Sequence, residues 1–349
     1  LKKYIFYLSA KGHMSQPKLS DVAALAGVSP TTVSRVLNNR GYLSEKTRSN
    51  VFEAMKTLGY RPNAIARSLQ GRKSQLIGLV FPSVAHPFYG EMAYRLESHL
   101  ADAGYKTILC NSGDRPEAEQ RYLDMLLANQ VDGVITGAHS QLVAQFPLMG
   151  APLVTIDRAE TGKAPNVRCD NYDGGYRATS LLLERGAKEP VHITSTASEV
   201  NLRLRGYRDA LAEHGITGRT LELGFDTPHA HKMEMIASYL DQYPTLDAVF
   251  ASNDIYAAMV LSCAQRLGLE VPTDLQVIGF DGAPYTRAML PHLATVMQPI
   301  DEIAQRAVAR LLHAIAGQED DLDGADVLPV NVYEGSTLRQ KQPDRVSLD

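Results

Sequence analysis

The stretch KLSDVAALAGVSPTTVSRVLNN, from Lys18 to Asn39, decides what the head of this chain is. Its first half has apolar residues at helical spacing and ends at Gly27, which predicts a short helix. Its second half opens with Ser29 and Pro30, a cap followed by a residue suited to the first helical position. The same spacing predicts a third helix between Ser44 and Gly59. Three short helices with a tight turn between the first two form a helix-turn-helix unit.

Charge is divided unevenly along the chain. Residues 15–73 carry ten Lys or Arg against three Asp or Glu, whereas residues 74–349 carry 22 basic against 36 acidic residues, and the whole chain has a net charge of -4. A small basic head on an acidic body indicates a polyanionic partner for the head alone. The alternatives are an ordinary solvated face and a plain helical bundle.

If the partner is DNA, the second helix of the head is the reading element. Its N-terminal residues enter the major groove, where the small side chains of Pro30 and Thr31 permit close approach. Arg35 can make a bidentate contact to guanine. The other polar residues on this helix are suited to phosphate contacts or flank its first turn: Ser29, Thr32, Ser34 and Asn38.

The segment YRPNAIARSLQGRKS, Tyr60 to Ser74, is expected to be a hinge. Pro62 ends the preceding helix, and Asn63 can cap a short new one that presents Arg67 and ends near Leu69. So short a helix is marginal in water by itself, so it would order against a partner, with Leu69 wedged into a minor-groove base step. Without DNA we expect a flexible tether.

The sequence resembles the LacI/GalR family of bacterial transcription regulators. DVAALAGVSPTTVSRVLNN, GYRPNAIARSL and IGLVFP match the family pattern in order, and the match continues to about Arg339. The resemblance implies that Pro30, Thr31 and Arg35 contact bases and that Leu69 is the minor-groove lever. The runs NNRGYLSEKTR, IDR and DNYDGG look most like the branch that controls sucrose and related oligosaccharide or fructoside genes.

From Gln75 onward, short apolar runs alternate with amphipathic helices in two series, which predicts an α/β body of two doubly wound parallel-sheet lobes. This arrangement resembles sugar-binding proteins of the periplasmic type. The expected organisation is a tag or upstream extension (1–14), a helix-turn-helix domain (15–62), a hinge (63–74) and an effector-binding domain (75–349). Within that domain we expect lobe one at about 75–170 and 299–330, and lobe two at about 171–297 and 331–339.

Ligands of such sheets bind at the carboxyl ends of the strands. Aromatic rings there suit the C–H faces of a sugar, and carboxylates, amides and guanidinium groups suit its vicinal hydroxyls. The residues expected to bind the effector are Phe88, Tyr89, Asp157, Arg158, Arg203, Phe225, Asn253, Asp281 and Gln298. The resemblance aligns Arg203 with the effector-binding arginine of the family. Phe88 as a core residue, Arg203 in a surface ion pair and Asp254 as a helix cap remain alternatives.

Other chemistry finds little support. His229 and His231 are expected in a polar loop without a Cys or third ligand nearby, so we expect no metal. The common nucleotide-binding and hydrolase motifs are absent from the sequence, so we expect no cofactor and no enzymatic activity. Three widely spaced cysteines fit a reducing compartment, and no run of eighteen apolar residues occurs. A cytoplasmic protein is the expectation.

The sequence therefore predicts a homodimeric repressor that binds a pseudopalindromic operator in double-stranded DNA under the control of a small carbohydrate. The tail QKQPDRVSLD has no leucine heptads, which favours a dimer over a coiled-coil tetramer. Two alternatives stay open within regulation: a global catabolite regulator that answers to a phosphocarrier protein, and a regulator with a non-sugar corepressor such as a nucleobase. An exported solute-binding protein and an enzyme are the rivals from other classes.

Overall fold

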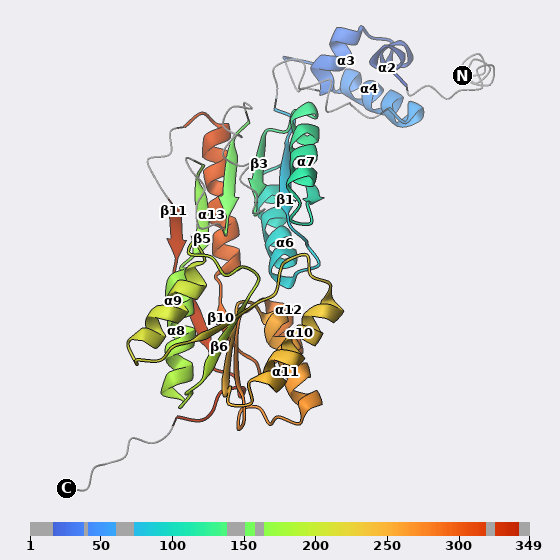
Figure 1. Ribbon diagram of the computed structural model, residues 1–349. Coiled ribbons are helices and arrows are strands. Elements are labelled where there is room, and N and C mark those ends of the chain that lie inside the picture. The colour runs from blue at the N-terminus through green and yellow to red at the C-terminus, as the bar shows by residue number, and fades with distance from the viewer. Residues whose placement is uncertain are drawn as a thin grey trace. The chain divides into compact units, whose positions relative to one another are not determined.

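The computed structural model describes residues 17–37, 41–60, 73–137, 151–157, 164–318 and 325–341 (Figure 1). The chain divides into two compact units, Leu1–Ser74 and Gln75–Asp349. Within the described ranges, no helix is both long and apolar enough to cross a membrane.

The described residues of the first unit form the helices α2 (Leu19–Ala26), α3 (Pro30–Leu37) and α4 (Glu45–Leu58). Gly27 ends α2 with φ 67°, a left-handed conformation that glycine adopts without strain. The turn is then closed by Ser29, whose Oγ accepts a hydrogen bond from the amide of Thr32 at 3.1 Å. The helices pack around one small core: Val22, Ala23, Val33, Val36, Val51 and Ala54. The helix-turn-helix predicted from the sequence is confirmed.

The first lobe of the second unit is a six-stranded parallel sheet in the order β11-β5-β4-β3-β1-β2. The strands are β1 (Leu76–Phe81), β2 (Lys106–Asn111), β3 (Gly133–Thr136), β4 (Leu153–Ile156), β5 (Asn166–Cys169) and β11 (Ala325–Leu328). Within its described ranges, this lobe has the helices α6 (Pro87–Asp102), α7 (Pro116–Ala128) and α13 (Ile300–Ile315).

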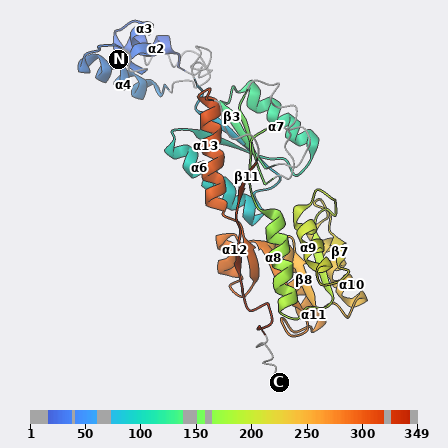
Figure 2. The ribbon, with the colours of Figure 1, turned by 90° about the vertical axis from the view of Figure 1, so that its left-hand side faces the viewer.

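Side chains of β1 point alternately to the two faces of this sheet, and both faces are covered by helices. Ile77 and Leu79 belong to the core shared with α6 and α13, whereas Val80 belongs to the core shared with α7. A Cβ on Gly78 would meet Leu126 of α7, so glycine lets that helix approach the strand closely. Figure 2 shows α13 beside α6, on the opposite side of the strands from α7.

The second lobe repeats this architecture with the sheet order β12-β10-β9-β8-β6-β7. Its strands are β6 (Pro190–Thr194), β7 (Arg219–Glu222), β8 (Ala248–Ala251), β9 (Gln276–Asp281), β10 (Ala294–Met297) and β12 (Asn331–Tyr333), and β12 alone is antiparallel to its neighbour. Its helices are α8 (Asn171–Glu184), α9 (Leu202–Ala212), α10 (His229–Gln242), α11 (Asp254–Leu267) and α12 (Pro284–Met289). The predicted pair of doubly wound lobes is confirmed.

The chain passes between the lobes three times. It leaves the first lobe between β5 and α8, returns between β10 and α13, and leaves again between β11 and β12. Helix α13, which follows the second of these crossings, therefore packs on the first sheet and covers β3, β4 and β5 (Figure 1). Both lobes are therefore built from discontinuous segments, and these three connections are the covalent links at which one lobe could turn relative to the other.

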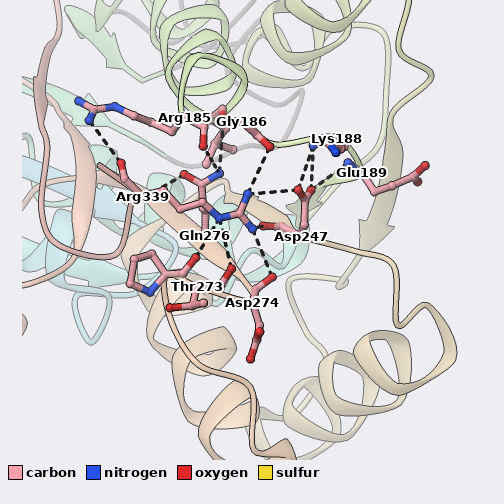
Figure 3. A network of polar contacts seen from close by, with 11 residues as sticks. Arg185, Gly186, Lys188, Glu189, Asp247, Thr273, Asp274, Gln276 and Arg339 are labelled. Carbon is pink, nitrogen blue, oxygen red and sulfur yellow. Dashed lines mark hydrogen bonds and ion pairs between the residues drawn. The ribbon is translucent and has the colours of Figure 1, made fainter. Parts of the chain in front are cut away.

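A cluster centred on Arg339 fastens the end of the described chain to the second lobe (Figure 3). The Arg339 guanidinium donates to the carbonyls of Pro272, Thr273 and Gly186 and pairs with the Asp247 carboxylate at 3.3 Å. Asp247 in turn accepts hydrogen bonds from the amides of Lys188 and Glu189. One side chain thus joins loops that are distant in the sequence.

Replacing Arg339 should destabilise the second lobe. Arg339→Ala leaves the Asp247 carboxylate and several loop carbonyls without their charged donor, which we expect to cost about 2 kcal/mol. The midpoint of thermal unfolding of the full chain measures this loss. Arg208→Ala, which removes an exposed pair with Glu199, is the matched control and should have little effect. Equal melting of the two variants would contradict the assigned role.

Candidate functional site

The outer surface of α3 carries the residues predicted to read bases. Pro30, Thr31 and Arg35 are exposed, whereas Val33 and Val36 are buried in the core of the head. The Arg35 guanidinium lies beside Gly41, where a Cβ would clash with it. An exposed helix face with small residues at its start and an arginine one turn later has the shape and charge that a major groove accepts.

The remaining predicted DNA contacts divide into two sets. Thr32 and Ser34 are half-buried on α3, and Ser29 is exposed with its hydroxyl 2.9 Å from that of Thr32. The other predicted DNA contacts lie outside the described residues: Asn38, Asn63, Arg67 and Leu69. The predicted effector contact Arg158 also lies outside them.

In the second unit, Arg203 of α9 lies where the two lobes meet. Its Nε donates to Asn171 Oδ1 at 2.7 Å, and its guanidinium stacks on the Phe280 ring, 3.6 Å from the centroid. It lies 3.8 Å from Asp157 of the first lobe and 3.6 Å from Asp281 of the second. Burial opposes the charge of Arg203, but the two carboxylates outweigh that effect and raise its pKa. With 14% of its side chain exposed, Arg203 is no surface ion-pair partner.

Two glycines bring Arg203 to this position. A Cβ on Gly175 of α8 would collide with the Arg203 carbonyl, and a Cβ on Gly206 of α9 would collide with the Tyr172 carbonyl. Helices α8 and α9 can therefore pack backbone against backbone. This close packing sets the start of α9 against the first turn of α8, so that Arg203 meets Asn171.

The two aspartates beside Arg203 have unusual backbones. Asp157 has φ 51° and Asp281 has φ 104°, a region that side-chain-bearing residues rarely adopt. Gln298 donates to Asp281 Oδ1 at 2.9 Å, and Asn171 donates to Asp157 Oδ1 at 3.4 Å. Strain of this kind persists where surrounding contacts over-determine it, and it is concentrated at functional sites. Burial raises the pKa of Asp281, and Arg203 opposes that rise.

The neighbouring pair Asn253–Asp254 has roles different from those that the sequence left open. Asn253 caps α11, accepting a hydrogen bond from the Tyr256 amide at 2.8 Å, so Asp254 is not the cap. Asp254 is instead buried, and accepts from Thr295 at 2.6 Å and from the Gly282 amide at 2.9 Å. It therefore fixes the turn that follows Asp281.

The predicted aromatic contacts lie in different surroundings. Phe88 and Tyr89 both belong to the core of the first lobe, with ring centroids 5.0 Å apart. Phe88, being 2% exposed, has the packing of a core residue. Phe225 is half-buried in the second lobe, and its carbonyl accepts a hydrogen bond from Lys232.

Three further residues join this region and were missed from the sequence: Asn171, His86 and Lys232. Asn171 follows β5, a strand that was not foreseen, so the rule of searching after each strand skipped it. His86 comes two residues before Phe88, in a segment that was searched only for aromatic rings. Lys232 follows the two histidines that were assessed for metal binding; His229 and His231 begin α10, so their prediction as loop residues was wrong. Within the described residues no group of three or more His, Cys, Asp or Glu is arranged to hold a metal ion.

Comparison with known proteins identifies the class. Residues 18–63 match the model of bacterial regulatory proteins of the lacI family, and residues 74–332 match the model of periplasmic binding proteins and the sugar binding domain of the LacI family. The chain belongs to the LacI family of bacterial regulatory proteins. Membership makes it a regulator and not an enzyme.

Two relatives and two solved structures are similar along nearly their whole length. The sucrose operon repressors of Pediococcus pentosaceus and Streptococcus mutans are 43% and 41% identical, each match covering 92% of this chain and 99% of the relative. The lac repressor dimer bound to operator and the anti-inducer ONPF has a TM-score of 0.81 at 27% identity, over 93% of this chain and 100% of that one. The regulator CelR in complex with cellobiose has a TM-score of 0.66 at 28% identity, over 92% and 99%.

The buried Asp254 carboxylate should leave a trace in the pH dependence of stability. Burial raises its pKa from 3.8 to about 6 in the folded chain. Between these values the folded state holds a proton that the unfolded state has lost, so stability should fall as the pH rises from about 4 to about 6, by about 3 kcal/mol for this group.

Asp254→Asn cannot titrate and should lose this part of the decline. Midpoints of thermal unfolding measured at pH 4, 5, 6 and 7 test this, with Asp241→Asn, an exposed carboxylate on α10, as the control. A wild-type pH profile in Asp254→Asn would refute the assignment.

Proposed function

We propose that this protein is a transcriptional repressor that binds operator DNA as a homodimer and changes its affinity when a sugar binds where its two lobes meet. Family membership and the two sucrose operon repressors support this, and they favour sucrose, a fructoside or a related sugar as the effector. The observation that carries the proposal is the buried Arg203, which contacts carboxylates of both lobes. Such a repressor acts on the chromosome and therefore in the cytoplasm.

In this proposal the DNA is read by the exposed face of α3. Pro30 and Thr31 approach the base edges, Arg35 pairs with guanine, and Ser29, Thr32, Ser34 and Asn38 contact the backbone or support the first turn. The hinge residues Asn63, Arg67 and Leu69 enter the minor groove, which requires two hinges side by side. Two heads related by a two-fold axis read a pseudopalindrome.

The sugar is bound by the polar groups around Arg203. Ion pairs of 3.6 and 3.8 Å are longer than a direct hydrogen bond, so Asp157 and Asp281 keep acceptor capacity for sugar hydroxyls. Asn253, Gln298 and Arg158 complete the polar set, and Phe225 offers a ring face. Tyr89 and Phe88 support the first-lobe wall from the core side.

Control follows from the difference between two arrangements of the lobes. A sugar held by Asp157 of one lobe and Asp281 of the other favours the closed arrangement, and the first lobes of the dimer then rotate so that the hinges no longer fit together. Sugar and DNA must favour different conformers, and each weakens the binding of the other by the same factor.

The alternatives left open by the sequence are not favoured. The relatives reported above are named for sucrose operons and not for a phosphocarrier-dependent regulator or a nucleobase corepressor. An exported solute-binding protein would have no use for a basic helix-turn-helix head.

Replacement of Arg35 should weaken specific DNA binding without unfolding the head. The side chain is exposed, and loss of one bidentate base contact costs about 1–3 kcal/mol, or roughly ten- to a hundredfold in affinity. The test is a binding titration with DNA that the wild-type chain selects from a random library. Lys56→Ala, at the exposed end of α4, is the control. Unchanged discrimination between selected and scrambled DNA in Arg35→Ala would exclude Arg35 as a base reader.

Replacement of Arg203 should separate the two activities. Arg203→Lys keeps the charge but loses the planar fork, so we expect the response to sucrose, fructose and related sugars to be lost while ligand-free DNA binding persists. Thermal shift with each sugar, followed by DNA titration with the sugars that bind, measures both. If the variant remains folded and responds to sugar as the wild type does, the effector site lies elsewhere.

A further inference from the structure

Lys232 is a buried cation in the second lobe. It is 9% exposed and lies in the first turn of α10, where its ammonium donates to the Phe225 carbonyl at 3.0 Å. It also lies 5.3 Å from the centroid of the Tyr256 ring. Among the residues that the structure describes, no carboxylate is within ion-pair distance of it. Lysine is almost never buried without a compensating charge, so this ammonium has spare capacity to bind an anion.

His86 of the first lobe belongs to the same electrostatic neighbourhood. It is the residue before α6, and its Nδ1 is buried without a hydrogen-bond partner in the described part of the chain. Burial, followed by the charges of Arg203 and Lys232, lowers the pKa of His86 to about 4. The imidazole is therefore neutral at pH 7 and can donate from one ring nitrogen. His86 follows β1 and Lys232 lies in the helix that follows β7, so both come from the carboxyl ends of parallel strands, the edge at which ligands of such sheets bind.

The charges of this region are separated. The negative charges of Asp157 and Asp281 raise the pKa of Arg203, and both also contribute to the raised pKa of Tyr89. Within the described chain, the carboxylate that affects the pKa of Lys232 is a different one: the exposed Asp226 opposes the lowering caused by burial. One part of the region therefore offers acceptors for hydroxyl groups, and the other offers an ammonium and an imidazole as donors.

We propose that Lys232 and His86 bind the phosphate group of a phosphorylated sugar, whose hydroxyls are held by Asp157 and Asp281. This inference rests on the proposed function and names the chemical class of the effector. A phosphate offers three acceptor oxygens and a charge near -2, and lysine binds it as a point charge. The phosphate compensates the charge of the buried ammonium of one lobe and accepts a hydrogen bond from the imidazole of the other; a neutral sugar could accept hydrogen bonds but supplies no compensating charge.

Matched pairs of ligands test the proposal on the full-length protein. Calorimetric titrations would use fructose and fructose 6-phosphate, glucose and glucose 6-phosphate, and sucrose and sucrose 6-phosphate, together with glucuronate and inorganic phosphate. We expect at least one phosphorylated sugar to bind about tenfold or more tightly than its neutral partner. Glucuronate, with a single negative charge, should gain much less.

Lys232→Met assigns the preference to this side chain. Methionine fills a buried site without a charge, so the variant should stay folded, which its melting temperature verifies. It should lose about tenfold of the affinity for the phosphorylated sugar and retain the affinity for the neutral one. Lys106→Met, on the exposed edge of β2, should behave as the wild type. His86→Gln, which keeps a hydrogen-bond donor, should lose less than Lys232→Met.

The inference is overturned if no phosphorylated sugar binds more tightly than its neutral partner, or if Lys232→Met weakens both members of a pair equally. Equal affinity for glucuronate and glucose 6-phosphate would indicate a general anion site and not a phosphate site, which would also overturn the inference. The proposed function is tested separately by DNA affinity. If neutral sugars alter DNA binding and phosphorylated sugars are no better, the phosphate site fails alone. If neither kind alters it, sugar control itself fails.

Discussion

The arrangement of the two lobes depends on the compensation of one buried charge. Arg203 stands on α9 of the second lobe, and its guanidinium is shared by Asp281 of the same lobe and Asp157 of the other. Removing one partner from a buried pair is costly because the remaining charge is left without compensation. Separation of the lobes would therefore leave Arg203 with one carboxylate. Any ligand that replaces the lost contacts changes the balance between open and closed arrangements, which is what a regulator requires.

The sequence determined most of the fold because its signals were local. The turn of the head and the caps Ser29 and Ser44 could be identified without tertiary contacts, and the buried strands were visible as short apolar runs. The segments that escaped prediction are β5, β11 and β12. Residues 166–169 of β5 read Asn-Val-Arg-Cys, with polar and apolar residues mixed, and β12 has only three residues at a sheet edge. Such strands form because a neighbouring strand supplies hydrogen-bond partners, and their own composition does not reveal this.

The candidate site was predictable where topology decided it and not where side-chain packing did. Searching after each strand selected Asp157 and Asp281, since parallel strands present their carboxyl ends at one edge. Arg203, several residues after its strand, was selected by the resemblance to the family. The rule cannot decide which of two adjacent polar residues caps a helix: the sequence offered Asp254 as the alternative cap and Asn253 as an effector contact, whereas Asn253 is the cap. It also misses Lys232, which projects from within a helical turn and whose burial depends on Phe225 and Tyr256.

The separation of charge at the junction of the lobes constrains what a regulatory ligand must do. A ligand shifts a conformational equilibrium only by its difference in affinity for the two states. Contacts to one lobe alone are the same in both arrangements and contribute nothing to control. Asp157 with Asp281, and His86 with Lys232, are each pairs drawn from different lobes, so a ligand that spans both pairs would add its contacts to the opposite lobe only upon closure. The selectivity of this protein for its effector and the strength of its response would then have the same physical origin.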